Sequence, residues 1–92
     1  MIRTFADRDC RRLFEGRPSK RYSGIRAQAE RRLTILDAAT SLADLSGLPS
    51  NRLEALEGDR AGKYSIRIND QWRICFEWNE DGADEVEIVD YH

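Results

Sequence analysis

The stretch KYSIRINDQWRICFEWNEDGADEVEIVDYH, residues 63–92, decides the fold because apolar and polar side chains alternate along it in three runs. Successive side chains of a strand point to opposite faces, so each run predicts a strand with one buried face. The ND pair at 69–70 and the NEDGAD segment at 79–84 are typical of turns. We therefore predict a three-stranded antiparallel meander with these apolar positions: Tyr64, Ile66 and Ile68; Trp72, Ile74, Phe76 and Trp78; Val86 and Ile88.

Upstream of these strands the apolar spacing becomes helical. Asp7 or Asp9 is suited to cap a short helix that ends near Glu15, just before Gly16. From Ser23 a second pattern predicts a helix of about 18 to 20 residues. Its apolar stripe is formed by Ile25, Ala29, Leu33 and Leu36, widened by Ile35, Ala38 and Leu42.

The remaining segments complete the predicted layout. MIRTFAD, residues 1–7, predicts a further strand at the start of the chain. SGLPSN, residues 46–51, starts a loop that we expect to continue through residues 52–63. A chain of 92 residues has room for one core, so residues 1–92 should form a single α+β domain. Its two N-terminal helices should pack on one face of a small antiparallel sheet.

Composition excludes several classes of protein. Cys10 and Cys75 are the only cysteines and His92 is the only histidine, too few for a disulfide framework or a zinc site, so we expect free thiols. We also expect no cofactor. Neither a secretory signal nor an apolar run of roughly 18 residues is present. We therefore expect a cytoplasmic protein without a membrane partner.

Charge is distributed unevenly along the chain. Residues 1–35 contain ten basic side chains and four acidic ones, a net charge of +6, whereas the remainder carries −8. A basic half is suited to a phosphate backbone, because neutralising phosphates releases counterions. The sequence pI of 5.4 is nevertheless low for a dedicated nucleic-acid binder. Composition thus leaves open both RNA binding and a solvated helix face.

Arg73 lies between Trp72 and Ile74, in the strand expected at the centre of the sheet. A charge there needs partners, because burying it alone is prohibitive. One interpretation is a cross-strand ion pair with Glu77 or Glu87. The other is a rigidly held guanidinium that binds a phosphate, for which its planar donors are well suited.

The chain closes on Asp90, Tyr91 and His92. Terminal residues usually fray, so a polar tail is the simplest interpretation. If the last strand stays regular, however, Asp90 and His92 continue the row of Val86 and Ile88 beyond the core. Two titratable groups would then lie together at the rim of the sheet.

The pattern as a whole resembles a known family. NRLEALEGDRAGKYSIRINDQWRICFEW, residues 51–78, followed by VEIVDYH, residues 86–92, is similar to the HigB branch of the RelE superfamily. These are the toxins of bacterial type II toxin-antitoxin modules, and the resemblance covers nearly the whole chain.

This resemblance implies a ribosome-dependent endoribonuclease that cuts messenger RNA in the ribosomal A site without a metal. Such chemistry needs a base for the ribose 2′-OH, an acid for the leaving 5′-oxygen and positive charge for the phosphate. The family pattern implies that Asp90, Tyr91 and His92 form the proton-transfer and positioning cluster and that Arg73 stabilises the phosphate. His92 suits proton transfer, because an imidazole titrates near neutral pH.

The preceding loop departs from the family pattern. Many relatives carry histidine where this chain has Glu54 and lysine where it has Glu57. Glu54 is thus either a member of the catalytic site or a loop carboxylate paired with Arg52 or Arg60, and a further negative charge beside a phosphate is unfavourable unless it is paired. The resemblance implies that the loop cations line the messenger; they are Arg52, Arg60 and Lys63.

The expected partners follow from the same resemblance. They are the 70S ribosome with its messenger, and a cognate HigA-like antitoxin with a helix-turn-helix domain, through which alone the protein would reach operator DNA. Two alternatives remain open. One is a catalytically weak or idle module that binds antitoxin and acts as a co-repressor. The other is a RelE-fold toxin with a non-nuclease target of the gyrase-inhibiting kind, although such relatives lack the terminal cluster.

Overall fold

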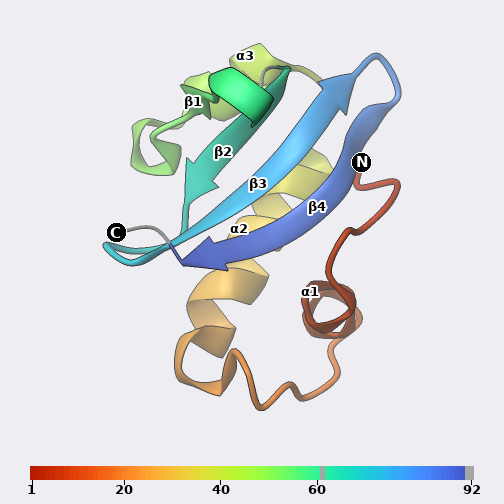
Figure 1. Ribbon diagram of the computed structural model, residues 1–92, viewed down its shortest axis with the longest axis vertical. Coiled ribbons are helices and arrows are strands. Elements are labelled where there is room, and N and C mark those ends of the chain that lie inside the picture. Colours follow the sequence, from red (N-terminus) through yellow and green to blue (C-terminus); the bar gives the residue numbers. More distant parts are fainter. Residues whose placement is uncertain (61, 91–92) are drawn as a thin grey trace.

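A computed structural model describes residues 1–60 and 62–90 of the chain. A four-stranded antiparallel sheet is ordered β1-β2-β3-β4, and its strands are Glu54–Ala55, Lys63–Arg67, Trp72–Asn79 and Gly82–Asp90. The α-helices are α1, Arg8–Phe14, α2, Arg26–Ala38, and α3, Leu42–Ser46. Three short 3₁₀ helices are η1, Ser23–Ile25, η2, Pro49–Asn51, and η3, Gly58–Arg60. In Figure 1, α2 lies behind the sheet. The predicted α+β class is confirmed.

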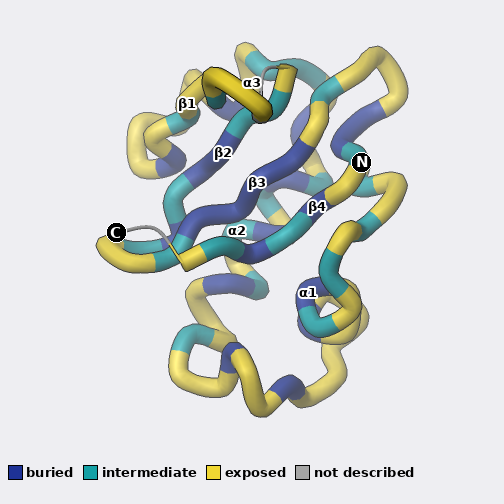
Figure 2. Tube along the Cα trace, in the orientation of Figure 1, coloured by how far each residue is buried: buried dark blue, intermediate teal, exposed yellow. Residues whose placement is uncertain are grey.

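The core lies between one face of the sheet and the helices. Ile66 of β2 pairs with Ile74 of β3, which in turn pairs with Ile88 of β4, so that three isoleucines form a buried row. Cys10 and Leu13 of α1 and Ala29, Leu33 and Leu36 of α2 pack in the same cluster. Figure 2 shows the buried positions running along β2 and β3. The alternation in residues 63–90 therefore predicted the three main strands and their inner face correctly.

The predicted strand at residues 1–7 is wrong as a regular strand. The segment is extended and makes two isolated parallel bridges to β4, Ile2 with Ala83 and Phe5 with Val86. Two backbone N–H groups of this region donate to side chains instead of to the backbone of a paired strand. The Ile2 N–H donates to Asp37 Oδ1 at 2.8 Å, and the Glu85 N–H donates to Thr4 Oγ1 at 2.8 Å. The segment therefore lies along the outer edge of β4 without completing a ladder.

The predicted long helix is too long at its C-terminal end. Helix α2 ends at Ala38, and Leu42 begins the separate helix α3. The break comes from reciprocal capping: the Asp44 N–H donates to Ser41 Oγ at 3.1 Å, while Asp44 Oδ2 accepts from the Thr40 N–H at 2.9 Å. Such side-chain acceptors favour a new helix start over continuation of the old one.

Helix α1 begins as its sequence predicts. Asp7 is the N-cap, and its carboxylate accepts from the Asp9 N–H at 2.9 Å. The buried hydroxyl of Tyr22 also donates to Asp7, which ties the segment before α2 to the start of α1. No helix within the described residues has the length and apolar character needed to cross a bilayer.

Gly82 permits the close approach of the first residue to the β3–β4 turn. Its φ is +133°, and a Cβ there would lie 2.1 Å from the carbonyl oxygen of Met1. We expect Gly82→Ala to lower the free energy of unfolding by about 1 to 3 kcal/mol, measured by urea denaturation. Gly24→Ala is the matched control, because Gly24 has open space around its Cβ position. Equal stabilities of the two variants would contradict this account of Gly82.

The buried thiol of Cys10 and the buried phenol of Tyr22 make the stability of the fold sensitive to high pH. Burial, followed by the charges of Asp7 and Glu87, raises the pKa of the Cys10 thiol far above its ordinary value of 9.0. Burial and the hydrogen bond to Asp7 likewise raise the pKa of Tyr22. Both groups are protonated in the folded protein, so their contribution is fully present below the unfolded pKa values and is lost progressively as the pH rises from there toward the raised folded pKa values.

The free energy of unfolding should therefore stay level up to about pH 8, begin to fall at about pH 8.5, and fall more steeply above about pH 10, where Tyr22 also contributes, as measured by urea denaturation at each pH. Cys10→Ala should flatten the lower part of this decline. An unchanged slope in that variant would count against the role assigned to the thiol.

Candidate active site

The site is built on the sheet face opposite the helices. Arg73 of β3 pairs with Arg67 of β2 and with Val89 of β4. Alternation places the side chains of Arg67 and Arg73 on the face opposite the isoleucine row. Two positively charged side chains are thus held side by side on neighbouring strands.

Buried polar contacts hold the Arg73 guanidinium. The residue is only 8% exposed. Its Nε donates to Ser65 Oγ at 2.8 Å, and its Nη2 donates to the carbonyl oxygens of Ser65, at 3.2 Å, and Arg52. The predicted ion pair with Glu77 or Glu87 is wrong, because Glu87 faces Cys75 in the register and the carboxylate beside Arg73 is that of Glu54. The interactions of Arg73 thus orient a rigid cation.

The Arg52 carbonyl is presented by an unusual backbone conformation. Arg52 has φ 44° and ψ 56°, in the left-handed region, directly after η2. The residue before it, Asn51, is fully buried and donates through Nδ2 to the Leu45 carbonyl at 3.0 Å. Arg32 of α2 donates to Asn51 Oδ1 at 2.7 Å. Helix α2 therefore fixes the turn whose carbonyl holds Arg73.

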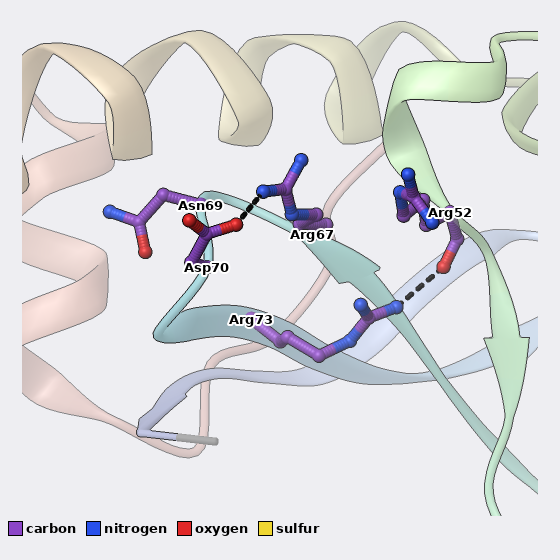
Figure 3. Close-up of a pocket in the computed structure, with 5 residues that line it drawn as sticks. All are labelled: Arg52, Arg67, Asn69, Asp70 and Arg73. Carbon is purple, nitrogen blue, oxygen red and sulfur yellow. Dashed lines mark hydrogen bonds and ion pairs between the residues drawn. The ribbon is translucent and has the colours of Figure 1, made fainter. Parts of the chain in front are cut away.

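A shallow pocket of about 350 Å³ opens beside these arginines. Its lining residues are Arg52, Arg67, Asn69, Asp70 and Arg73, as shown in Figure 3. Positive charge in this region extends to α2: burial, followed by the charges of Arg31 and Arg67, lowers the pKa of Arg32. Three guanidinium groups around one pocket are suited to bind an anion with several oxygen atoms, such as a phosphate.

Arg67 is a candidate site residue that the motif analysis missed. Its position was visible in the sequence, since it alternates with Ile66 and Ile68 just as Arg73 alternates with Trp72 and Ile74. The family motif drew attention to Arg73 alone.

The predicted terminal cluster is described only in part. Asp90 ends β4 opposite Trp72 and accepts from Gln71 Nε2 at 3.2 Å. Gln71 follows Asp70 in the β2–β3 turn, so Asp90 lies at the same end of the sheet as this turn. Tyr91 and His92 lie outside the described residues, and their catalytic assignment stays a prediction.

The loop residues have different positions relative to the pocket. Glu54 lies in β1, with Oε2 4.0 Å from Arg73 Nη2, so its described ion pair is with Arg73 and the expected pairing with Arg52 is wrong. Lys63 begins β2, opposite Glu77 and at the other end of the strand from Arg67. Arg60 ends η3, and its side chain lies outside the described part of the structure. Of the three predicted loop cations, Arg52 is the one that lines the described pocket.

The described residues contain no cluster of three or more histidine, cysteine, aspartate or glutamate side chains arranged to hold a metal ion. Cys10 and Cys75 are both buried, and neither forms a disulfide, as predicted.

The structure has a small antiparallel sheet with helices on one face and arginines on the other, which agrees with the fold class expected from the resemblance to the RelE superfamily. A family model described as RelE-like toxin of type II toxin-antitoxin system HigB matches residues 3–92, and the chain belongs to this family. Toxin HigB-1 of Vibrio cholerae is 40% identical over 82 residues, covering 85% of this chain and 84% of that protein. Endoribonuclease HigB of Proteus vulgaris is 33% identical over 96 aligned positions, covering all of both chains.

The Ser65 hydroxyl is expected to be essential for holding Arg73. Ser65→Ala removes the acceptor of a buried charged donor and should lower the free energy of unfolding by about 1.5 to 3 kcal/mol, measured by urea denaturation. Ser46→Ala, at an exposed hydroxyl of α3, should change it by less than about 0.5 kcal/mol. A Ser65→Ala variant as stable as the control would show that the hydroxyl is dispensable.

Proposed function

We propose that this protein is a ribosome-dependent endoribonuclease, the toxin of a type II module, which cuts messenger RNA in the A site and so inhibits translation and growth. The observation that carries the proposal is the buried, rigidly held Arg73 in a pocket of three arginines. Membership in the HigB-like family and the printed name of the Proteus vulgaris relative support it.

The proposed reaction is an acid-base attack within the RNA. A base removes the proton of the ribose 2′-OH, and the oxygen attacks the adjacent phosphorus. An acid protonates the leaving 5′-oxygen as its bond to phosphorus breaks, so that the products are a 2′,3′-cyclic phosphate and a free 5′-hydroxyl. Addition of water to the cyclic phosphate would then give a 3′-phosphate. Asp90, Tyr91 and His92 are the proposed proton-transfer and positioning groups. Their positioned acid-base chemistry would contribute typically about 10² to 10⁴ in rate.

Arg73 would stabilise the negative charge that grows on the pentavalent phosphate. Its donors are oriented before the substrate arrives, so little reorganisation is required during the reaction. Arg67, on the neighbouring strand, adds a second cation to the same pocket. The messenger would pass along Arg52, and Arg60 and Lys63 are proposed to contact it further along the loop.

Membership in a type II toxin family implies a cognate antitoxin. We propose that this antitoxin is a HigA-like helix-turn-helix protein, that operator DNA is reached only through it, and that the toxin meets the ribosome in the cytoplasm. A catalytically weak, antitoxin-binding co-repressor is the second candidate. The ion pair between Glu54 and Arg73 favours it, since a carboxylate stands where a phosphate would be stabilised.

The decisive test is messenger cleavage on purified 70S ribosomes. Arg73→Ala should slow cleavage by about 10²- to 10³-fold, and a variant lacking only His92 should lose at least about 10²-fold, both with antitoxin binding intact. Arg3→Ala is the control, because it removes an equal charge next to Asp81 and Asp84, at the β3–β4 end of the sheet.

Full activity without His92 would overturn its catalytic assignment. If the intact protein binds antitoxin but never cuts messenger on ribosomes, the idle co-repressor becomes the correct interpretation.

A further inference from the structure

Two arginines of the pocket are paired with carboxylates of the protein itself. Glu54 Oε2 lies 4.0 Å from Arg73 Nη2, and Asp70 Oδ1 accepts a hydrogen bond from Arg67 Nη2. The two carboxylates come from different elements, Glu54 from edge strand β1 and Asp70 from the β2–β3 turn. The same arrangement therefore occurs twice around one site.

Exposure separates the buried arginine Arg73 from the two carboxylates. The Arg73 side chain is 9% exposed, whereas that of Glu54 is 57% exposed and that of Asp70 is 98% exposed. A buried guanidinium that donates to Ser65 Oγ and to the carbonyl oxygens of Ser65 and Arg52 stays in place. An exposed carboxylate gains little from its ion pair, and its side chain can turn into solvent at small cost.

We propose that Glu54 and Asp70 act as internal anions, which occupy the guanidinium groups of Arg73 and Arg67 in the free protein and are displaced when an RNA phosphate enters. The choice of RNA as the displacing anion rests on the proposed function. That Glu54 and Asp70 compete with an entering anion for the two arginines is inferred only from the contacts described above.

This competition would weaken the binding of free RNA. Each phosphate that enters must replace an existing attraction and approach a carboxylate of like charge. A messenger held by the ribosome is presented to the pocket without the full entropic penalty of a separate association, so it can displace the carboxylates more readily. Glu54 and Asp70 would thus favour ribosome-bound messenger over free RNA.

The test compares charge-neutralising variants in binding a short RNA that carries a 2′-deoxy nucleotide at the cleavage point. Glu54→Gln and Asp70→Asn should each tighten the dissociation constant by about two- to fivefold, the equivalent of an exposed ion pair. The Asp70 variant should keep its turn, because the turn N–H groups of Gln71 and Trp72 donate to Asn69 rather than to Asp70.

Matched controls separate local competition from net charge. Glu57→Gln removes one negative charge from the loop that also carries Glu54, and Asp81→Asn removes one from the β3–β4 turn. Each should alter the dissociation constant for RNA by less than about 1.5-fold. In an Arg73→Lys background the gain from Glu54→Gln should shrink markedly, because the planar guanidinium is gone.

A second measurement is independent of nuclease activity. Titration with inorganic phosphate, followed through the Arg73 Nε–H signal by NMR, should show tighter binding in Glu54→Gln than in the intact protein. If this holds while the intact protein fails to cut messenger, the proposed function is wrong and the internal anion stands. If messenger is cut but neither carboxylate variant tightens RNA or phosphate binding, or Glu57→Gln has an equal effect, the internal anion is wrong. Weaker RNA binding in Glu54→Gln would also overturn it, since Glu54 would then contact the RNA directly.

Discussion

The organisation of the site depends on placing one arginine within the sheet. A charge at a buried strand position is tolerated only if its donors meet acceptors in the right directions. Ser65 supplies two such acceptors from the neighbouring strand, one on its side chain and one on its backbone. The third comes from Arg52, outside the main strands. The guanidinium therefore links the sheet to the loop, and the pocket forms at that junction.

The helical layer contributes to this site although it lies on the other face of the sheet. Arg32 of α2 contacts Asn51, and Asn51 contacts the end of α3, so the turn before β1 is fixed from two sides. The isoleucine row and the helices that cover it keep β2 and β3 in register. A correct register is what brings Arg67 opposite Arg73, since a slip of one residue between the two strands would turn one of these side chains to the other face of the sheet.

The sequence predicted those parts of the fold in which a local pattern and tertiary packing agree. The period of two between residues 63 and 90 identified β2, β3 and β4, because one face of each strand is apolar and packs against the helices. The short β1 could not be recognised in this way, since Glu54 and Ala55 are both exposed and show no alternation. The end of α2 had a signal that was overlooked, namely the Ser41 and Asp44 capping pair. The hydrogen bond from Arg73 to the Arg52 carbonyl left no trace in the sequence, because any residue has a carbonyl and only the folded chain shows which one is near.

That last contact has a consequence for how such a site can change during evolution. Because Arg73 is held at this point by a main-chain atom, the amino acid at position 52 is free to vary as long as its backbone can adopt the left-handed conformation. Side chains around the turn can then gain or lose charge without releasing the arginine. Divergence in this loop would alter the strength of the toxin in small steps, while the part of the site most costly to rebuild is inherited intact.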